Sequence, residues 1–179
     1  GSPMRNLGTI SDDGTPYIDL KKSTYIVGNI GLNEAVQVLT GKELHDSEEA
    51  YDTGLKIIAF MYQKIHEFKK NTGLKFTIEE TPAESTTRRL AILDKEKFPL
   101  ARKVVKGTDE NPYYTNSIHF APSADVGMID RIVGQSKFHD MIESGAIIHA
   151  WVGEQRPDKE AIRALVKTTL ENTRCSQLV

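Results

Sequence analysis

The sequence predicts an α/β fold, in which helices pack outside a sheet or part of a barrel. Helix-like and strand-like segments alternate along the chain, and this order is typical of α/β proteins. The most regular segment is 47–71, where apolar residues recur every three or four positions, as on one face of a helix. At 179 residues, the chain suits one domain or a large piece of one.

Residues 23–41 predict a strand followed by a helix. The segment opens with β-branched and apolar residues and becomes helical after Gly31, with Gly41 as the C-terminal stop. We expect the inward face of this helix to carry Leu32, Val36 and Leu39.

A long helix over 47–71 and a strand over 74–80 come next. Asp46 or Ser47 can cap the helix, and Gly73 follows its last turn. In the strand, apolar and polar residues alternate, as in a half-buried strand. The buried stripe of the helix is predicted to consist of Leu55, Ile58, Ala59, Tyr62, Ile65 and Phe68.

The second half of the chain continues the alternation. The patterns predict a helix from about Pro82 to Leu93, a strand over 113–120, one interrupted helix or two short ones over 124–145 with Gly134 near the break, a strand over 146–152, and a helix over 157–173. Residues 175–179 look like the opening of another strand. The inward residues of the last helix are expected to be Ile162, Leu165, Val166 and Leu170.

Composition limits the classes of function. Lys and Arg number 23 against 25 Asp and Glu, so the net charge of −2 gives no case for binding nucleic acid or a membrane surface. No apolar run approaches the ~20 residues that cross a bilayer, and no leader is visible, which favours the cytoplasm. Residues 1–4 (GSPM) read as a cloning scar.

Cysteine and histidine usage gives little support for a metal site. Cys175 is the single cysteine, so neither an internal disulfide nor a cysteine-cluster metal site is expected. The thiol is either a small buried group or a reactive one, and burial is the commoner case. The five histidines contain no HExxH pair, so no protein metal site is predicted.

Residues 75–89 (KFTIEETPAESTTRR) are the main candidate for a binding site. A strand that leads directly into a helix start often binds phosphate, because the first backbone N–H groups lack partners and carry partial positive charge. In the alternative, Thr81 caps the helix and Glu84 closes a capping box. Both can hold, since one box leaves several donors free. The candidate binding residues are Thr81, Ala83, Glu84, Ser85, Thr86 and Thr87.

A second polar group lies in residues 113–120 (YYTNSIHF). Asn116 and Ser117 fall near the start of the predicted strand, and polar groups at strand ends line sites in α/β folds. The alternative is that successive residues simply face opposite sides of a strand.

Five blocks, taken in order, resemble the anaerobic (class III) ribonucleoside-triphosphate reductases. They are 24–45 with its GLNE run, 73–99 with its TPAE loop, 113–120, 145–158 (GAIIHAWVGEQRPD) and 172–179 (NTRCSQLV). The resemblance covers nearly all of residues 15–179. It implies an oxidoreductase for deoxyribonucleotide biosynthesis whose ten-stranded α/β barrel has its helices outside, with this chain forming a half-barrel.

The resemblance also implies a chemistry and a set of partners. In this family a glycyl radical, installed by an S-adenosylmethionine-dependent iron–sulfur activase, passes to a cysteine at the barrel centre. The thiyl radical then takes hydrogen from the 3′ carbon of a ribonucleoside triphosphate. The full enzyme also has a structural zinc, and the subunits are expected to form a homodimer. The loop matching Thr81–Thr87 is expected to hold substrate phosphates, with Asn116 and Ser117 near the barrel mouth.

The chain departs from the family pattern in its radical machinery. The finger-loop cysteine would precede residue 15, where no cysteine occurs, and the N-terminal allosteric cone and the C-terminal zinc and glycyl-radical region have no match. We therefore expect residues 5–179 to be a fragment of the catalytic barrel that holds part of the phosphate site, carries no catalytic residue and is inactive alone. One alternative is a non-catalytic nucleotide-binding or assembly module of a split glycyl-radical enzyme. Another is a different glycyl-radical enzyme such as an acyl lyase, against which the hydroxyl-rich loop argues.

Overall fold

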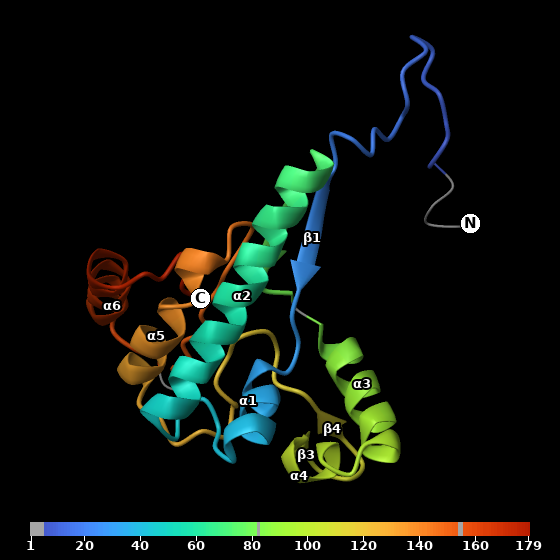
Figure 1. The fold of residues 1–179 in the computed structure, drawn as a ribbon. Helices are drawn as coiled ribbons and strands as arrows, with labels where there is room; N and C mark the ends of the chain where they lie inside the picture. Colours follow the sequence, from blue (N-terminus) through green and yellow to red (C-terminus); the bar gives the residue numbers. More distant parts are fainter. Residues whose placement is uncertain (1–5, 82, 154–155) are drawn as a thin grey trace.

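The computed structural model describes residues 6–81, 83–153 and 156–179, so the predicted cloning scar at 1–4 lies outside the described residues. Figure 1 shows the arrangement of the elements. In chain order they are β1 (Thr24–Gly28), α1 (Leu32–Thr40), α2 (Glu48–Thr72), β2 (Lys75–Glu79), α3 (Glu84–Lys97), α4 (Ala101–Val104), β3 (Lys106–Gly107), β4 (Pro112–Tyr113), α5 (Met128–Ser136), the 3₁₀ turn η1 (His139–Met141) and α6 (Lys159–Asn172).

The sheet formed by β1 and β2 is parallel, and the predicted α/β class is confirmed. β1 pairs with β2 in register from Thr24 opposite Lys75 to Gly28 opposite Glu79. Two isolated bridges are also parallel: one joins Glu79 at the end of β2 to Gly145, and the other joins Ile148 to Leu178. The predicted strands over 146–152 and 175–179 are therefore reduced to single bridges.

The predicted elements of the first half are confirmed, with errors in which residues face inward. The side chain of Ser47 caps α2 by accepting from the Ala50 N–H, and Gly73 ends the helix. Ile58 and Ile65 are buried, but Phe68 is 48% exposed and Leu39 of α1 is 68% exposed, so both were wrongly predicted as core. The strand β2 does not alternate either, because Thr77 and Ile78 are both buried.

One main core holds these elements together. It lies between α1, α2, β2 and the segments around Ile118 and Phe138, and its fully buried members include Val36, Leu44 and Ile58. A smaller cluster of Ile132, Ile148 and Cys175 lies toward the C-terminus. Cys175 is thus a buried thiol, and burial raises its pKa.

Residues 113–120 were wrongly predicted to be a strand. Only Pro112–Tyr113 is extended in a ladder, β4, which pairs antiparallel with β3. Asn116 makes one isolated bridge to Ile30, and the chain then turns, with the His119 N–H donating to the Asn116 carbonyl (3.1 Å). Ser117 has φ 45°, which no regular strand accommodates.

The region 124–145 forms two short helical pieces, α5 and η1, and the break between Ser136 and His139 lies near Gly134, as predicted. α5 runs through Gly134 to Ser136. A Cβ at Gly134 would lie 2.7 Å from the ring of Phe120, so this glycine makes room for an aromatic side chain.

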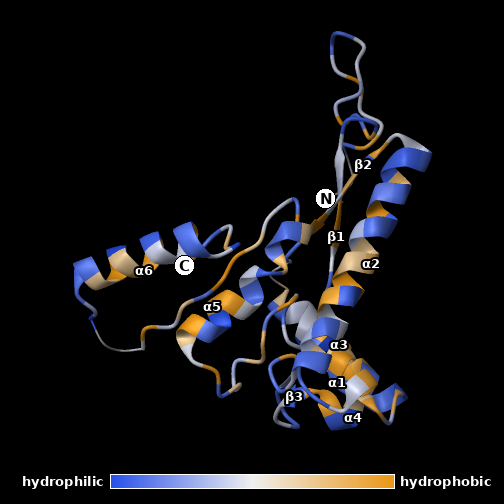
Figure 2. Ribbon diagram, turned by 60° about the vertical axis from the view of Figure 1, so that its left-hand side comes forward, coloured by the Kyte–Doolittle hydropathy of each residue, from blue (hydrophilic) through white to orange (hydrophobic). Residues whose placement is uncertain are grey.

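The helix α6 buries less of its apolar face than predicted: of the four residues expected to face inward, only Leu165 packs, half-buried, against the smaller core cluster. Its cap is Asp158, whose carboxylate accepts from the N–H groups of Glu160 and Ala161. Among its side chains only Thr169 is buried, while Ile162, Val166 and Leu170 are 37–51% exposed. Figures 1 and 2 both place α6 apart from α2 and on the opposite side of the molecule from α3. Within the described residues, no helix is long and apolar enough to cross a membrane.

Candidate functional site

The start of α3 is open and lacks a side-chain cap. The N-cap is Ala83 (φ −146°, ψ 43°), and no side chain bonds to the helix start. The predicted capping box of Thr81 and Glu84 is therefore wrong. The first N–H groups of an α-helix, here those of Glu84, Ser85 and Thr86, have no partner inside the helix.

Exposure differs among the predicted residues of this helix start. Glu84 and Ser85 are exposed, and Ala83 and Thr86 are half-buried. Thr87 is buried, and its hydroxyl donates to the Glu84 carbonyl (2.8 Å), so it is occupied within the helix. Pro82 lies outside the described residues. An anion that approaches from solvent would meet the amides of residues 84–86 and the hydroxyl of Ser85.

Thr81 lies against the end of β1. A Cβ built on Gly28 would lie 2.1 Å from Thr81 Oγ1, so the contact is possible only because residue 28 is glycine. Thr81 follows β2 by two residues and Gly28 is the last residue of β1. The loop before α3 therefore passes over the carboxyl ends of both parallel strands, where α/β folds place their binding sites.

Asn29, which directly follows β1, and Ser117 lie at the same strand end, which we call the polar corner. The Ser117 hydroxyl donates to Asn29 Oδ1 (3.2 Å), and the Gly31 N–H donates to the Thr115 carbonyl (2.9 Å). Among the described residues, the buried atoms Asn29 Nδ2 and Asn116 Oδ1 have no hydrogen-bond partner. One donor and one acceptor are thus unsatisfied beside Gly28 and Ser117, and such groups can bind a water molecule, an ion or a polar ligand atom.

Asn29 was missed by the sequence-based prediction. The available signal was its position, since it directly follows the carboxyl end of the first predicted strand. Predicted residues from two distant blocks contact neighbouring residues of the chain: Thr81 lies against Gly28, and Ser117 bonds to Asn29.

Glu34 fixes the polar segment at Thr115 through two hydrogen bonds. It is 1% exposed, and its carboxylate accepts from the Thr115 N–H (3.0 Å) and the Thr115 hydroxyl (2.6 Å). Tyr114 donates to Asp94 Oδ2 of α3 (3.0 Å), and burial first, then this bond, raises the pKa of Tyr114. The segment and the helix are therefore fixed relative to each other.

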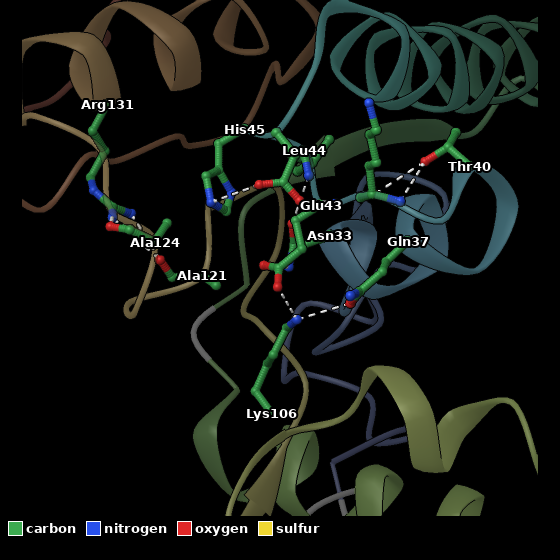
Figure 3. Close-up of polar contacts among 12 residues, drawn as sticks. Asn33, Gln37, Thr40, Glu43, Leu44, His45, Lys106, Ala121, Ala124 and Arg131 are labelled. Carbon is green, nitrogen blue, oxygen red and sulfur yellow. Dashed lines mark hydrogen bonds and ion pairs between the residues drawn. The ribbon is translucent and has the colours of Figure 1, made fainter.

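Asn33, the other polar residue of the GLNE run, has a structural role. Asn33 accepts from the Leu44 N–H (2.9 Å) and donates to Glu43 Oε2 (2.9 Å). Lys106 pairs with Glu43 and donates to Gln37, as Figure 3 shows. The same figure also shows Arg131 donating to the carbonyls of Ala121 and Ala124. The contacts of Asn33 and Lys106 tie α1 to the loop before α2 and to β3.

No metal site is formed by the described part of the chain: it has no group of three or more His, Cys, Asp and Glu side chains that could hold a metal ion.

Comparisons with known proteins agree on one family. The family model described as anaerobic ribonucleoside-triphosphate reductase matches residues 8–178. The reductase of Salmonella typhimurium is 30% identical over 139 residues, which are 77% of this chain and 19% of that protein. The Escherichia coli reductase is 28% identical over the same shares.

Solved structures show the same fold at lower identity. A structure of an anaerobic ribonucleotide reductase aligns with 94% of this chain and 25% of its own, with TM-score 0.64 and 20% identity. The Thermotoga maritima enzyme in complex with dATP and CTP aligns with 84% of this chain and 24% of its own, with TM-score 0.59 and 21% identity. The chain spans about a fifth of the length of the curated relatives that it matches. It belongs to the anaerobic ribonucleoside-triphosphate reductase family.

Proposed function

We propose that this chain is part of an anaerobic ribonucleoside-triphosphate reductase and that the start of α3 holds part of the substrate triphosphate. The single observation that carries the proposal is the uncapped, exposed helix start at Ala83–Thr86, placed over the carboxyl ends of β1 and β2. A helix start of this kind offers several N–H donors and partial positive charge to an anion.

The neighbouring groups suit the rest of a nucleotide. Asn29 Nδ2 is a buried donor without a partner among the described residues, and Thr81 and Ser117 add hydroxyls on either side of it. We propose that the helix start takes the phosphates and that Asn29, Asn116 and Ser117 face the sugar end. Family membership supports this direction, and the Thermotoga maritima relative is described in complex with dATP and CTP.

The larger assembly is also a proposal. We place residues 5–179 in a ten-stranded α/β barrel, as one part of its wall, with the rest of the reductase chain supplying the remaining strands. The glycyl radical, the activase that installs it, the structural zinc, a homodimer and a cytoplasmic location follow from the family. We expect the 179 residues alone to reduce no nucleotide, because removal of hydrogen from a ribose carbon needs a radical carrier, and Cys175 is buried and away from solvent.

Titration of the chain with ATP and CTP by calorimetry tests the phosphate site. The decisive variant is Ser85→Glu, because a carboxylate in the first turn favours the helix through its dipole while repelling a triphosphate. We expect Ser85→Glu to weaken binding by about tenfold or more, equivalent to one charge-assisted hydrogen bond, without loss of stability.

The matched control is Thr168→Glu, which adds the same charge to α6 on the opposite side of the molecule (Figure 1). Equal binding by wild type and Ser85→Glu would overturn the proposed site. Equal weakening by both variants would show that only overall charge matters. Absence of binding by the wild type would favour a purely structural or assembly role for the chain.

A further inference from the structure

Glu80 is a buried carboxylate that directly follows β2, immediately before Thr81. Its side chain is 3% exposed. Glu80 Oε2 accepts from the Ile147 N–H (3.0 Å) and lies 3.1 Å from His119 Nε2. Three segments that are distant in the sequence therefore meet on one carboxylate, at the base of the loop that leads to α3.

The proton positions around Glu80 follow from its neighbours. His119 Nε2 lies 3.1 Å from both Glu80 Oε2 and the Ile147 carbonyl, and both are acceptors, so Nε2 carries a proton. His139 Nδ1 accepts from the Ser176 N–H (3.0 Å), so this nitrogen carries none. A neutral His139 must then hold its proton on Nε2, which lies 3.5 Å from Glu80 Oε1.

The charge state of His139 agrees with this geometry. Burial lowers the pKa of His139, with His119 acting in the same direction and Glu80 and Asp140 opposing. Glu80 Oε2 is therefore the acceptor shared by the Ile147 N–H and the His119 Nε2–H, whereas Glu80 Oε1 and His139 Nε2, 3.5 Å apart, form no hydrogen bond within the described residues.

We infer that Glu80 is a positioning residue, whose carboxylate oxygen Oε2 fixes the loop that begins the phosphate site by accepting from the Ile147 N–H and from His119 Nε2. The inference rests on the proposed triphosphate site for its binding readout. Glu80 touches no substrate in this role; it acts through Thr81, which follows it directly and packs on Gly28.

The role needs one acceptor oxygen at the position of Oε2, where both donors arrive. A glutamine at position 80 keeps such an oxygen, with its NH₂ group in the place of Oε1, which has no hydrogen-bond partner within the described residues. A leucine has a similar size but no acceptor, so the Ile147 N–H and the His119 Nε2–H lose this partner.

The test is Glu80→Leu, with Glu80→Gln as the conservative variant and Glu79→Leu as the matched control on the preceding residue. We expect Glu80→Leu to weaken binding of inorganic tripolyphosphate about tenfold. Glu80→Gln should retain most of the affinity, and Glu79→Leu should leave it unchanged. Wild-type affinity in Glu80→Leu, or an equal loss in Glu80→Leu and Glu80→Gln, would overturn the inference.

A second pair of variants covers loss of folding in Glu80→Leu. His119→Gln keeps an N–H donor toward Glu80 and should retain affinity, whereas His119→Leu removes it and should lose affinity. Equal affinities in this pair would also overturn the inference. If the wild type binds no tripolyphosphate, the proposed function fails, but the positioning role is still decided by amide hydrogen exchange of Ala83–Thr86, which we expect to become faster in Glu80→Leu and to stay unchanged in Glu80→Gln.

Discussion

The contact between Gly28 and Thr81 makes the placement of the phosphate loop testable by one methyl group. In Gly28→Ala, the new Cβ would lie 2.1 Å from Thr81 Oγ1 and 2.9 Å from Thr81 Cβ, so one of the two segments must move. Overpacking of this kind costs roughly 1–3 kcal/mol of the free energy of unfolding. We also expect weaker triphosphate binding, because the displaced residue begins the loop to α3.

Urea denaturation followed by circular dichroism measures this loss. Gly145→Ala is the control, since its Cβ would meet only Glu79 Cγ at 3.8 Å. In the double variant Gly28→Ala with Thr81→Ala, the contact to Oγ1 disappears while the one to Cβ remains, so part of the stability should return as a coupling energy of about 0.5 kcal/mol or more. If Gly28→Ala is as stable as Gly145→Ala, or if the two changes simply add, the loop does not lie on β1 as described.

Two further predictions concern stability. Ser47→Ala removes the cap that accepts from the Ala50 N–H and should lower the free energy of unfolding by about 1 kcal/mol in urea; no loss would show that α2 does not depend on this cap. Burial lowers the pKa of His139 below its ordinary 6.5, so the unfolded chain binds this proton more readily. The neutral His139 therefore contributes fully to the free energy of unfolding above its unfolded-state pKa, and this contribution is lost as the pH falls through its folded-state pKa. The urea midpoint should therefore drop between about pH 7 and about pH 5 by more in the wild type than in His139→Gln, and parallel curves would contradict the assignment.

The elements that could be predicted are those with local signals. The cap at Ser47 and the glycine at Gly73 define α2 within the segment itself, and Gly31 and Gly41 do the same for α1. The inward face was less predictable. Leu39 and Phe68 continue an apolar spacing but extend past the end of the core, and in α6 the side chains of Ile162, Val166 and Leu170 are exposed. Periodicity gives a face but does not say how far the opposing surface extends.

The candidate site was predictable only in part. Chain order placed Thr81 and the α3 start beside a strand end, and the family resemblance pointed to the same loop. The contact between Ser117 and Asn29 spans 88 residues, and no local pattern reports it. The capping box failed for a related reason, because Thr81 is held against Gly28 and its side chain is not at the helix start.

The failed strand over 113–120 and the site have one physical cause. Two buried carboxylates, Glu34 in α1 and Glu80 after β2, both take donors from this segment, at Thr115 and at His119. The bond to Glu34 occupies the Thr115 backbone N–H, which a strand ladder would use, and the bond to Glu80 fixes the His119 side chain. Between the two fixed points the chain must turn, and it does so at Ser117 with φ 45°, a conformation that costs about 1 kcal/mol or more in a residue other than glycine. The turn places the hydroxyl of Ser117 on Asn29, so the carboxylates that prevent a regular strand are also what hold the polar corner beside the start of α3.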